Sequence, residues 1–539
     1  MERILLVEPD YKNKYPPIGL MKIASYHREK EDYVEFYKGK APYTTIVKFD
    51  RVYVTTLFTF YYEITVETIR HYLNHMHKDN VYVGGISATL LQKEYKQDLG
   101  IDNVIARQLT SSSLLGYDDE VDIDGLPLDY DILDDIKYEY PSGDNIFLYT
   151  TRGCPRNCEF CAVSKLEPKF QDTNNLINQI NATKEKYGDK RNVLIMDNNI
   201  LYSKELNRVV QDLNAVGYIN DTPSYSGVNY VEVMLAKIKR RRKFKNDYSR
   251  QVEELVEYLN SFKSKVKSKE LIKRYNDILD YINNEENKIK AFIKVKKETV
   301  EIIEKYRFKR KLQRYVDFNQ GLDARLLTNE KMKTMSKIAI KPFRLAYDSI
   351  DDEKIYRNAF NMAHSNGVKY FSNYMLYNYK DSPYDLWRRL HNTILLYENK
   401  SDIQAFSFPM KYAPVDVTSR EYIGEKWNRK YLSAINTILN VTKGIVAKEK
   451  GFFYEAFGSN KKEFIEILTM PNQFIKYRML FKKHGYIKRW KRKYKTLDSK
   501  ERKVLLEYLC GLKDEMRIKN KKILSIIPLY SIKAIKGVR

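Results

Sequence analysis

The sequence predicts an α/β protein with helical additions, and three observations support this. Short apolar segments alternate with helical stretches over about 1–125, and again from Asn145 onward. A stretch over about 228–314 is dense in Lys, Arg and Glu, has almost no Gly or Pro, and repeats apolar residues at helical spacing. From about 411 the pattern is mostly helical and ends in a basic tail. With 539 residues the chain exceeds one ordinary core, so two to four domains are expected.

The first alternation predicts a parallel sheet. Strands are expected at Arg3–Val7, Arg51–Thr56, Asn80–Val83 and Val104–Ala106, and helices at Ile18–Glu29 and Glu63–His77. Strand–helix alternation of this kind indicates a Rossmann-like domain, here over 1–125. A polar, Asp-rich passage from Asp118 to Asp135 follows. It is typical of a link between domains, and a connector is expected over 126–145.

The second alternation predicts a partial or full α/β barrel over 146–410. Its strands are expected at Ile146–Thr150, Val193–Met196, Tyr315–Phe318, Phe343–Ala346 and Tyr370–Leu376, with a helix near Thr173–Tyr187. The basic stretch over 228–314 interrupts this core. It predicts a pair or trio of long helices forming a protruding hairpin, which either docks a partner or only packs on itself. A helical C-terminal region is expected over 411–539.

Composition limits the classes of partner. The net charge of +25 fits a polyanionic partner such as RNA. The alternative is a bias of base composition, because Lys, Asn, Ile and Tyr are frequent throughout. No run of about 18 apolar residues occurs, so no spanning helix and no membrane partner are expected. Glu8 interrupts the N-terminal apolar run too early for a signal peptide, and the cytoplasm is the expected location.

Three of the four cysteines, Cys154, Cys158 and Cys161, lie within eight residues, after the strand predicted at 146–150. In α/β folds this edge of the sheet carries the sites. Thiolates at C-x3-C-x2-C spacing can ligate three irons of a [4Fe–4S] cluster and leave the fourth open. Structural zinc normally needs four ligands, but Cys510 is distant and no histidine is near. A disulfide would leave one thiol unpaired. The spacing therefore predicts an iron–sulfur cluster.

The loop also resembles a known family. Its spacing, Phe160 before the last cysteine and the preceding Arg152-Gly153 resemble the radical S-adenosylmethionine (SAM) superfamily. Other segments resemble a subgroup with an N-terminal cobalamin (B12)-binding-type domain. They are Pro16–Leu20, Val83–Gly85, Leu126–Tyr130, Asp317–Arg325 and Arg344–Asp348. The resemblance spans about 1–225 and 315–410; it omits the basic stretch and covers the C-terminal region only loosely.

The resemblance implies a radical SAM enzyme. In that family an external donor of the flavodoxin or ferredoxin type reduces the cluster, SAM is cleaved, and the resulting radical abstracts hydrogen from a C–H bond. Polar strand-end residues, with Phe160 of the loop, are the candidates for binding SAM: Asp197, Asn198, Asn199, Gln320, Asp323, Arg325 and Asp348. Each strand-end residue has an alternative role as a cap or turn residue. No catalytic residue is singled out, and the family's Gly-Gly-Glu motif is absent.

Cobalamin is a candidate cofactor of the N-terminal domain. Many cobalamin domains use an Asp-x-His-x-x-Gly loop, but the loop Glu8–Tyr15 contains no histidine. Gly84-Gly85 either lets a cofactor approach the backbone closely or only makes a tight turn. Three functions therefore stay open. The first is radical chemistry, including methyl transfer, on a small molecule or peptide. The second is modification of a nucleic acid, and the third is a cluster-bearing scaffold or sensor.

Overall fold

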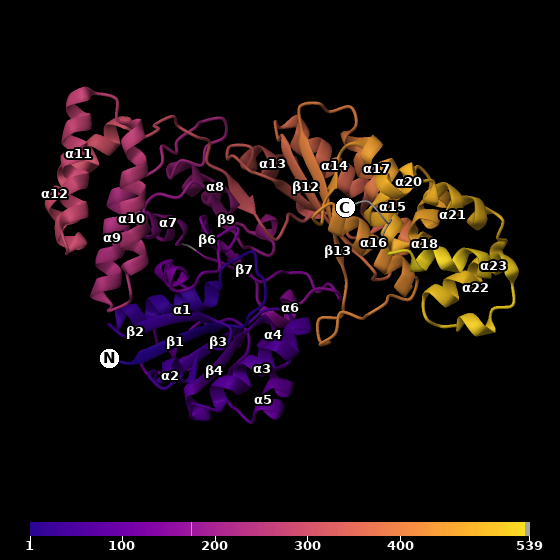
Figure 1. The fold of residues 1–539 in the computed structure, drawn as a ribbon, viewed down its shortest axis with the longest axis horizontal. Coiled ribbons are helices and arrows are strands. Elements are labelled where there is room, and N and C mark those ends of the chain that lie inside the picture. Colours follow the sequence, from indigo (N-terminus) through magenta and orange to yellow (C-terminus); the bar gives the residue numbers. More distant parts are fainter. Residues whose placement is uncertain (174, 534–539) are drawn as a thin grey trace. The chain divides into compact units, whose positions relative to one another are not determined.

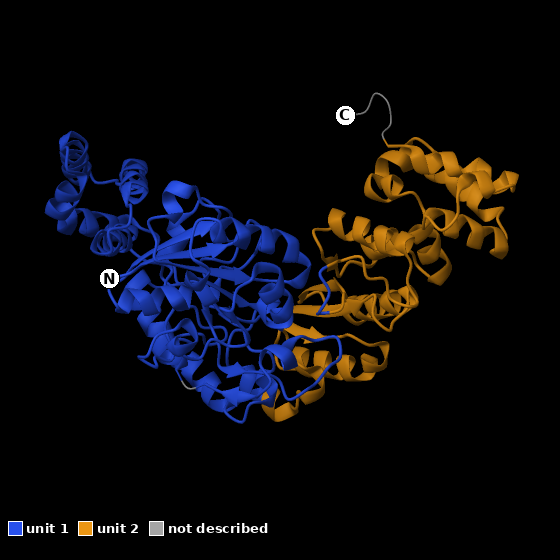
Figure 2. Cartoon of the chain, turned by 90° about the horizontal axis from the view of Figure 1, so that it is seen from below, with its two compact units in different colours: residues 1–320, 333–341, 415–418 blue, residues 321–332, 342–414, 419–539 orange. Residues whose placement is uncertain are grey.

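The computed structural model describes residues 1–173 and 175–533 of this α/β protein (Figure 1). The chain divides into two compact units (Figure 2). The first consists of 1–320, 333–341 and 415–418, and the second of 321–332, 342–414 and 419–539. This division differs from the expected domain bounds, which stay a prediction. Residue 174 of the predicted helix and residues 534–539 of the basic tail lie outside the described residues.

The first unit begins with a parallel five-stranded sheet in the order β2-β1-β3-β4-β5, which is Rossmann-like as expected. Its strands are β1 (Arg3–Glu8), β2 (Tyr33–Lys38), β3 (Arg51–Thr56), β4 (Val81–Gly85) and β5 (Val104–Ile105). The helices between them are α1 (Ile18–Glu29), α2 (Tyr43–Ile46), α3 (Tyr62–Leu73), α4 (Ile86–Leu90) and α5 (Gln92–Leu99). Ile4 and Leu6 of β1 belong to one core cluster, while Leu5 and Val7 belong to another. The alternation shows that both faces of the sheet are buried.

Two expectations for this sheet need correction. The strand β2 was not predicted, and it pairs along the whole of β1. The helix expected to reach His77 ends at Leu73, because the chain turns at Asn74. The expected helix Ile18–Glu29 and strand Arg51–Thr56 are confirmed at both ends.

A second parallel sheet of the first unit carries the cysteine loop. Its order is β10-β9-β6, formed by β6 (Ile146–Leu148), β9 (Val193–Ile195) and β10 (Val316–Phe318). A short antiparallel pair, β7 (Thr151–Arg152) and β8 (Gln171–Asp172), lies just after β6. The helices α6 (Val163–Leu166), α7 (Leu176–Tyr187) and α8 (Leu206–Ala215) follow the loop and β9.

The basic insertion has four helices in the described chain, not the predicted pair or trio (Figure 1). They are α9 (Tyr230–Lys243), α10 (Ser249–Phe262), α11 (Lys269–Asn284) and α12 (Lys288–Tyr306). The helices share a hydrophobic core of their own, which includes Leu255, Tyr275 and Ile303 at 0% exposure. A hairpin was expected because no Gly or Pro marks the breaks between helices. The insertion is a small helical bundle.

The first helix of the insertion is anchored to the Asp-rich passage. Arg240 pairs with Asp131 at 2.7 Å, and Arg241 pairs with Asp135 at 2.8 Å. Lys237 adds a third pair with the same passage. In the first two pairs one or both side chains are buried, and opposite charges this close hold the two segments together. The segment predicted as a connector therefore also fixes the insertion to the rest of the first unit.

The insertion and this passage also cover the edge strand β2. The amide of Phe36 donates to Asp135 Oδ2 at 2.9 Å. The carbonyl of Val34 accepts from Asn246 of the insertion at 2.8 Å and from Arg28 at 3.0 Å. Side chains therefore occupy backbone groups that an edge strand otherwise leaves unpaired.

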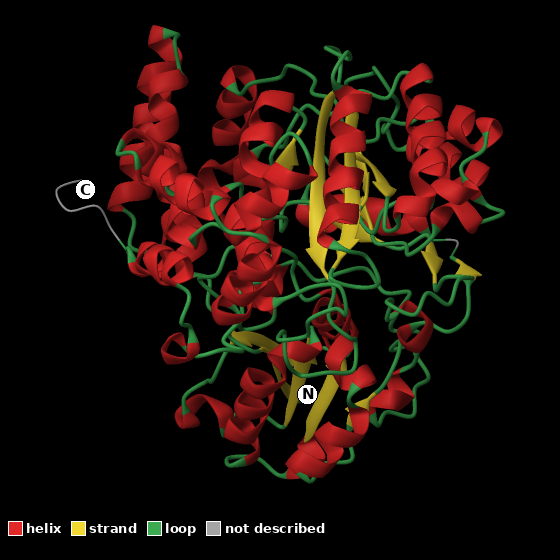
Figure 3. Ribbon diagram, turned by 90° about the vertical axis from the view of Figure 1, so that its right-hand side faces the viewer, coloured by secondary structure: helices red, strands yellow, loops and turns green. Residues whose placement is uncertain are grey.

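The second unit contains a four-stranded sheet in the order β11-β12-β13-β14. Its strands are β11 (Phe343–Ala346), β12 (Tyr370–Tyr377), β13 (Gln404–Lys411) and β14 (Val446–Ala447); only β14 is antiparallel. Helices α14 (Glu353–Ser365) and α15 (Pro383–Tyr397) connect the parallel strands. Figure 3 shows helices packed around each set of strands. The strands expected in one barrel thus form two sheets, one in each unit.

Helices dominate the rest of the second unit, as the sequence predicts. They are α16 (Arg429–Val441), α17 (Lys450–Phe457), α18 (Lys461–Thr469), α19 (Asn472–Lys476), α20 (Arg478–Lys483), α21 (Tyr486–Lys495), α22 (Ser499–Leu509) and α23 (Lys521–Ile526). The helix α13 (Asn329–Met335) lies earlier in the chain, and its last residues, 333–335, belong to the first unit. Throughout the described part of the chain, no helix is both long and apolar enough to span a bilayer.

Candidate metal centre

The cysteine loop begins at the carboxyl end of β6, as expected, and Gly153 fixes its first turn. Gly153 has a φ of +73°, a conformation that residues with a Cβ rarely adopt. A Cβ on Gly153 would lie 2.2 Å from the carbonyl oxygen of Lys169. Only glycine lets the backbone before Cys154 approach the segment that follows the loop. The two ends of the loop are thereby brought together.

Glu167 ties the base of the loop to its surroundings. Its carboxylate accepts hydrogen bonds from the amide of Gly153 at 2.7 Å, from Arg152 Nη1 at 2.9 Å and from Asn198 Nδ2 at 2.8 Å. The guanidinium of Arg152 lies 3.2 Å from the ring centroid of Tyr149 and is nearly buried. Arg152 also pairs with Asp124. The chain around the loop is therefore held by buried, charged hydrogen bonds, which are stronger than neutral ones.

The three cysteines are half-buried, and none of them forms a disulfide. The amide of Cys161 donates to the carbonyl of Cys158 at 2.9 Å, which closes a tight turn containing Phe160. Asn199 Nδ2 lies 3.6 Å from Cys154 Sγ, within hydrogen-bond reach of sulfur. The other side-chain atom, Asn199 Oδ1, is buried and has no hydrogen-bond partner among the described residues.

These residues fit an iron–sulfur cluster. Three sulfur donors at the carboxyl end of a parallel strand match the ligand set of a cluster with one open iron. An N–H group aimed at a cysteine sulfur, as from Asn199, is one of the contacts that tune such clusters. The fourth thiol, Cys510, belongs to the second unit, where its Sγ lies 3.7 Å from Asn428 Oδ1. The donor set of the loop is therefore three thiols rather than the four of a structural zinc site.

The three candidate residues after β9 have different surroundings. Asp197 is buried and accepts hydrogen bonds from the amides of Thr150 at 2.7 Å and Thr151 at 3.0 Å, and from the Thr150 hydroxyl. Burial raises the pKa of Asp197 to about 6. Its oxygens thus join the ends of β6 and β9. Asn198 supports Glu167, and Asn199 alone reaches a cysteine while keeping an unsatisfied oxygen.

The remaining candidates lie further along the chain. Gln320 is exposed just after β10, at the end of the first unit's main segment. The other three, Asp323, Arg325 and Asp348, belong to the second unit. There Asp323 caps a short 3-10 turn and pairs with Arg325 at 2.7 Å. Asp348 accepts from the amide of Leu376 at 3.1 Å, and burial raises its pKa. Binding of SAM by any of these residues stays a prediction.

A cavity of about 230 Å³ lies in the first unit between the sheet edge and the cysteine loop. Gly84 and Gly85 line it at the end of β4, and a Cβ on Gly85 would lie 2.3 Å from the carbonyl oxygen of Thr56. Arg152 and Glu167 form part of its wall, so the cavity and the loop share two residues. Sequence reasoning missed Glu167 and this cavity. A lone acidic residue after the cysteines carries no local signal, and cavities arise from tertiary packing.

The cavity bears on the candidate cobalamin. Its volume is below the roughly 300–1,000 Å³ typical of pockets for drug-sized ligands. It is mostly apolar, and its position at the carboxyl edge of a parallel sheet is the usual place for a cofactor. The cavity could therefore hold one part of a cofactor as large as cobalamin, and the rest of the cofactor would lie outside the cavity.

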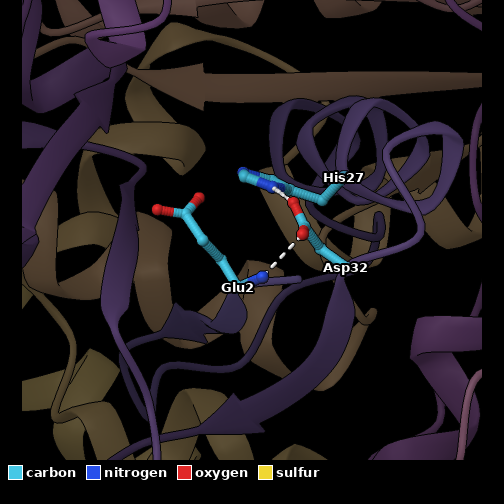
Figure 4. Close-up of side chains that lie close together, drawn as sticks. All are labelled: Glu2, His27 and Asp32. Atoms are coloured by element: carbon cyan, nitrogen blue, oxygen red, sulfur yellow. Dashed lines mark hydrogen bonds and ion pairs between the residues drawn. The ribbon is translucent and has the colours of Figure 1, made fainter.

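A second group of possible metal ligands, Glu2, His27 and Asp32, lies in the first unit (Figure 4). Asp32 Oδ2 lies 2.9 Å from His27 Nδ1, and the Tyr53 hydroxyl lies 3.2 Å from His27 Nε2. The amide of Glu2 donates to Asp32 Oδ1 at 2.7 Å. Both ring nitrogens of His27 are therefore engaged by protein groups. We assign the cluster a structural role, joining the end of α1 to β1 and β3.

No family model and no curated protein matches the chain. Among solved structures, the chain is similar to the apo, SeMet-labelled cobalamin-dependent S-adenosylmethionine radical enzyme OxsB, with 11% sequence identity and a TM-score of 0.36. The match covers 76% of this chain and 53% of that one, so this chain spans about half the length of that enzyme.

Proposed function

We propose that the protein is a radical SAM enzyme with a [4Fe–4S] cluster on Cys154, Cys158 and Cys161. The observation that carries the proposal is the cysteine loop itself, in which three thiols follow the carboxyl end of β6. When reduced by an external donor, such a cluster supplies the electron that cleaves SAM and starts radical chemistry on a C–H bond. Within the protein, Gly153 and Glu167 hold the loop in place.

Asn199 is the residue best placed to serve both cluster and SAM. Its amide nitrogen donates toward Cys154 Sγ, and its buried oxygen lacks a donor. A buried acceptor without a partner costs free energy, on the order of 1–3 kcal/mol, unless a ligand satisfies it. We propose that Asn199 Oδ1 accepts a hydrogen bond from the amino group of SAM. This assignment gives the amino group a partner in a chain that lacks the Gly-Gly-Glu motif.

The charged network beneath the loop has a supporting role. Arg152, Glu167 and Asn198 are tied to one another, and Arg152 stacks on Tyr149. Because Arg152 is buried and paired, its guanidinium is held in a fixed position beneath the loop. These residues orient the cysteines and take no part in the reaction. A ligand entering the neighbouring cavity would meet the same Arg152 and Glu167, which would link its binding to the loop.

The substrate we propose is a small molecule or peptide. Methyl transfer is included if cobalamin binds at the carboxyl edge of the first sheet. The test of the proposed function uses anaerobically purified, reconstituted protein. Iron and sulfide are counted, and the electron paramagnetic resonance spectrum of the reduced protein is recorded with and without SAM. About four irons per chain and a signal altered by SAM are expected.

Matched variants sharpen this test. Replacing any one of Cys154, Cys158 and Cys161 by serine should abolish the signal, whereas Cys510→Ser should leave it intact. Formation of 5′-deoxyadenosine under strong reduction would distinguish an enzyme from a scaffold or sensor. Zinc in place of iron, or a signal indifferent to SAM, would reject the proposed function.

A further inference from the structure

The C-terminal helices of the second unit carry an unopposed positive segment. Between Lys476 and Lys495 the sequence has ten Lys and Arg residues and no Asp or Glu. The helix α21 buries Ile487, Trp490 and Tyr494, with 9%, 0% and 6% exposure, against the neighbouring helices. Its charged residues point outward because they occupy the opposite face of the helix. The exposed basic residues of α21 are Lys488, Arg489, Arg492 and Lys495.

These residues surround a hollow of about 1040 Å³, which we call the basic hollow. Residues of α17, α18, α20 and α21 line it. Its acidic residues are already engaged: Glu455 lies 3.9 Å from Lys482, and the carboxylate of Glu463 accepts from the amide and hydroxyl of Ser459. Five basic side chains in the hollow form no ion pair with any described residue: Arg478, Lys488, Arg489, Arg492 and Lys495.

Arg478 lies at the wall of the basic hollow and is the least satisfied of these groups. Its Nη2 atom is buried and has no hydrogen-bond partner among the described residues. Burial lowers the pKa of Arg478, with Glu455 the charge that opposes this shift. A guanidinium that is partly desolvated without a partner destabilises the fold, because its hydration is lost without replacement. An anion entering the hollow would supply the missing acceptor.

We propose that the basic hollow binds the phosphate backbone of single-stranded RNA. Phosphates complement the five unpaired cations, and Arg is well suited to them because its planar group donates two parallel hydrogen bonds. The carboxylates of Glu455 and Glu463 also line the hollow. They repel phosphates but accept hydrogen bonds from the 2′-hydroxyls that distinguish RNA from DNA. A flexible single strand can enter a hollow of this size, whereas a straight duplex contacts only its rim.

A lipid surface is a poorer match. A helix that binds a membrane turns its apolar face toward the lipid. In α21 that face is buried in the protein through Trp490 and its neighbours. The insertion also carries exposed lysines, such as Lys290 and Lys297. Its arginines Arg240 and Arg241 are already paired with Asp131 and Asp135, whereas Arg478 of the basic hollow has an atom without a partner among the described residues, which makes the hollow the better match. The inference goes beyond the proposed enzyme and does not depend on it, because binding needs no cluster.

The test measures fluorescence anisotropy of a labelled single-stranded RNA of about 20 nucleotides, longer than typical single-strand sites. The full-length protein is titrated between about 50 and 200 mM salt. Neutralisation of five phosphates predicts a slope of log affinity against log salt of about −3.5, at about 0.7 per phosphate. In the double variant Arg489→Glu/Arg492→Glu the slope should become about −2 and the affinity should fall about ten-fold or more.

A matched control makes the same change of charge on the insertion. Lys290 and Lys297 of α12 are exposed, so Lys290→Glu/Lys297→Glu should leave RNA binding unchanged. A further variant, Arg478→Met, should weaken binding several-fold while raising the melting temperature, because it removes a buried charge without a partner. Gain of stability with loss of affinity separates a binding role from a merely structural one.

Several results would overturn the proposal. One is the absence of salt-dependent RNA binding by the parent protein. Another is loss of binding in the insertion variant with retention in the Arg489/Arg492 variant. Equal affinity for duplex DNA, or binding of anionic vesicles without RNA binding, would reject RNA as the occupant. Because apoprotein suffices for these measurements, their failure would leave the cluster proposal untouched, and failure of the cluster proposal would leave them valid.

Discussion

Gly153 offers a sharp test of how the cysteine loop is held. Substitution by alanine forces a Cβ into the left-handed region, at a cost of about 1–2 kcal/mol. The same Cβ would lie 2.2 Å from the carbonyl oxygen of Lys169, a backbone atom that cannot swing away like a side chain. Overpacking of this kind adds about 1–3 kcal/mol. Gly153→Ala should therefore destabilise the loop by about 2–5 kcal/mol, the sum of these two ranges.

The control separates the two contributions. Gly100 has a φ of +65°, and a Cβ there meets nothing within 4 Å. Gly100→Ala should therefore lower the free energy of unfolding only by the cost of the left-handed conformation, about 1–2 kcal/mol. Both variants are compared by iron content after reconstitution and by denaturant midpoint. Gly153→Ala should retain far less iron, because the backbone before Cys154 must move. Equal iron content and equal midpoints in the two variants would refute the argument that close approach at Gly153 shapes the site.

Three further predictions concern other groups. Asn199→Leu removes both the N–H donor near Cys154 and the Oδ1 acceptor proposed for SAM, so the reduced cluster's spectrum should shift and SAM should bind at least several-fold more weakly; an unchanged spectrum and SAM titration would contradict this. Arg240→Met leaves the buried carboxylate of Asp131 without its ion-pair partner, which should destabilise that contact by about 3–5 kcal/mol. The insertion should then be cleaved faster by a protease, and an unchanged rate of cleavage would argue against the anchor. Burial lowers the pKa of His27 in the folded protein. As the pH drops from about 7 to 5, His27 is protonated in the unfolded chain before it is protonated in the folded one, so the free energy of unfolding should fall. His27→Gln should flatten that part of the profile of denaturant midpoint against pH, and an identical slope in the two proteins would be the contrary result.

The sequence predicts the core strands well because burial on both faces leaves continuous apolar runs. Arg51–Thr56 and Phe343–Ala346 are confirmed at both ends. The strand Tyr33–Lys38 was missed because Glu35 and Lys38 interrupt its apolar pattern, as suits an edge strand with one polar side. The strand Gln404–Lys411 was missed because Pro409 argues against a strand in a local reading. In both cases pairing with distant strands overrides the local signal.

The same limit applies to the site. The spacing of three cysteines identifies the candidate cluster loop, since the ligands are neighbours in sequence. The support from Glu167 depends on how residues 152, 153 and 198 converge in space, and no local pattern encodes that. The basic hollow lies between these extremes. Its charge is visible in the sequence, but the pairing of charges that leaves Arg478 unsatisfied is visible only in three dimensions.

The contacts of the insertion with β2 have a consequence for deletion experiments. Removing 228–314 would take away Asn246, which donates to the Val34 carbonyl, and would remove the Arg241 partner of Asp135. The exposed strand edge would then be free to pair with another chain, and the shortened protein should aggregate. Loss of activity in such a truncation would report poor solubility rather than a lost binding arm. Point substitutions on the outer faces of α11 and α12 avoid this artefact.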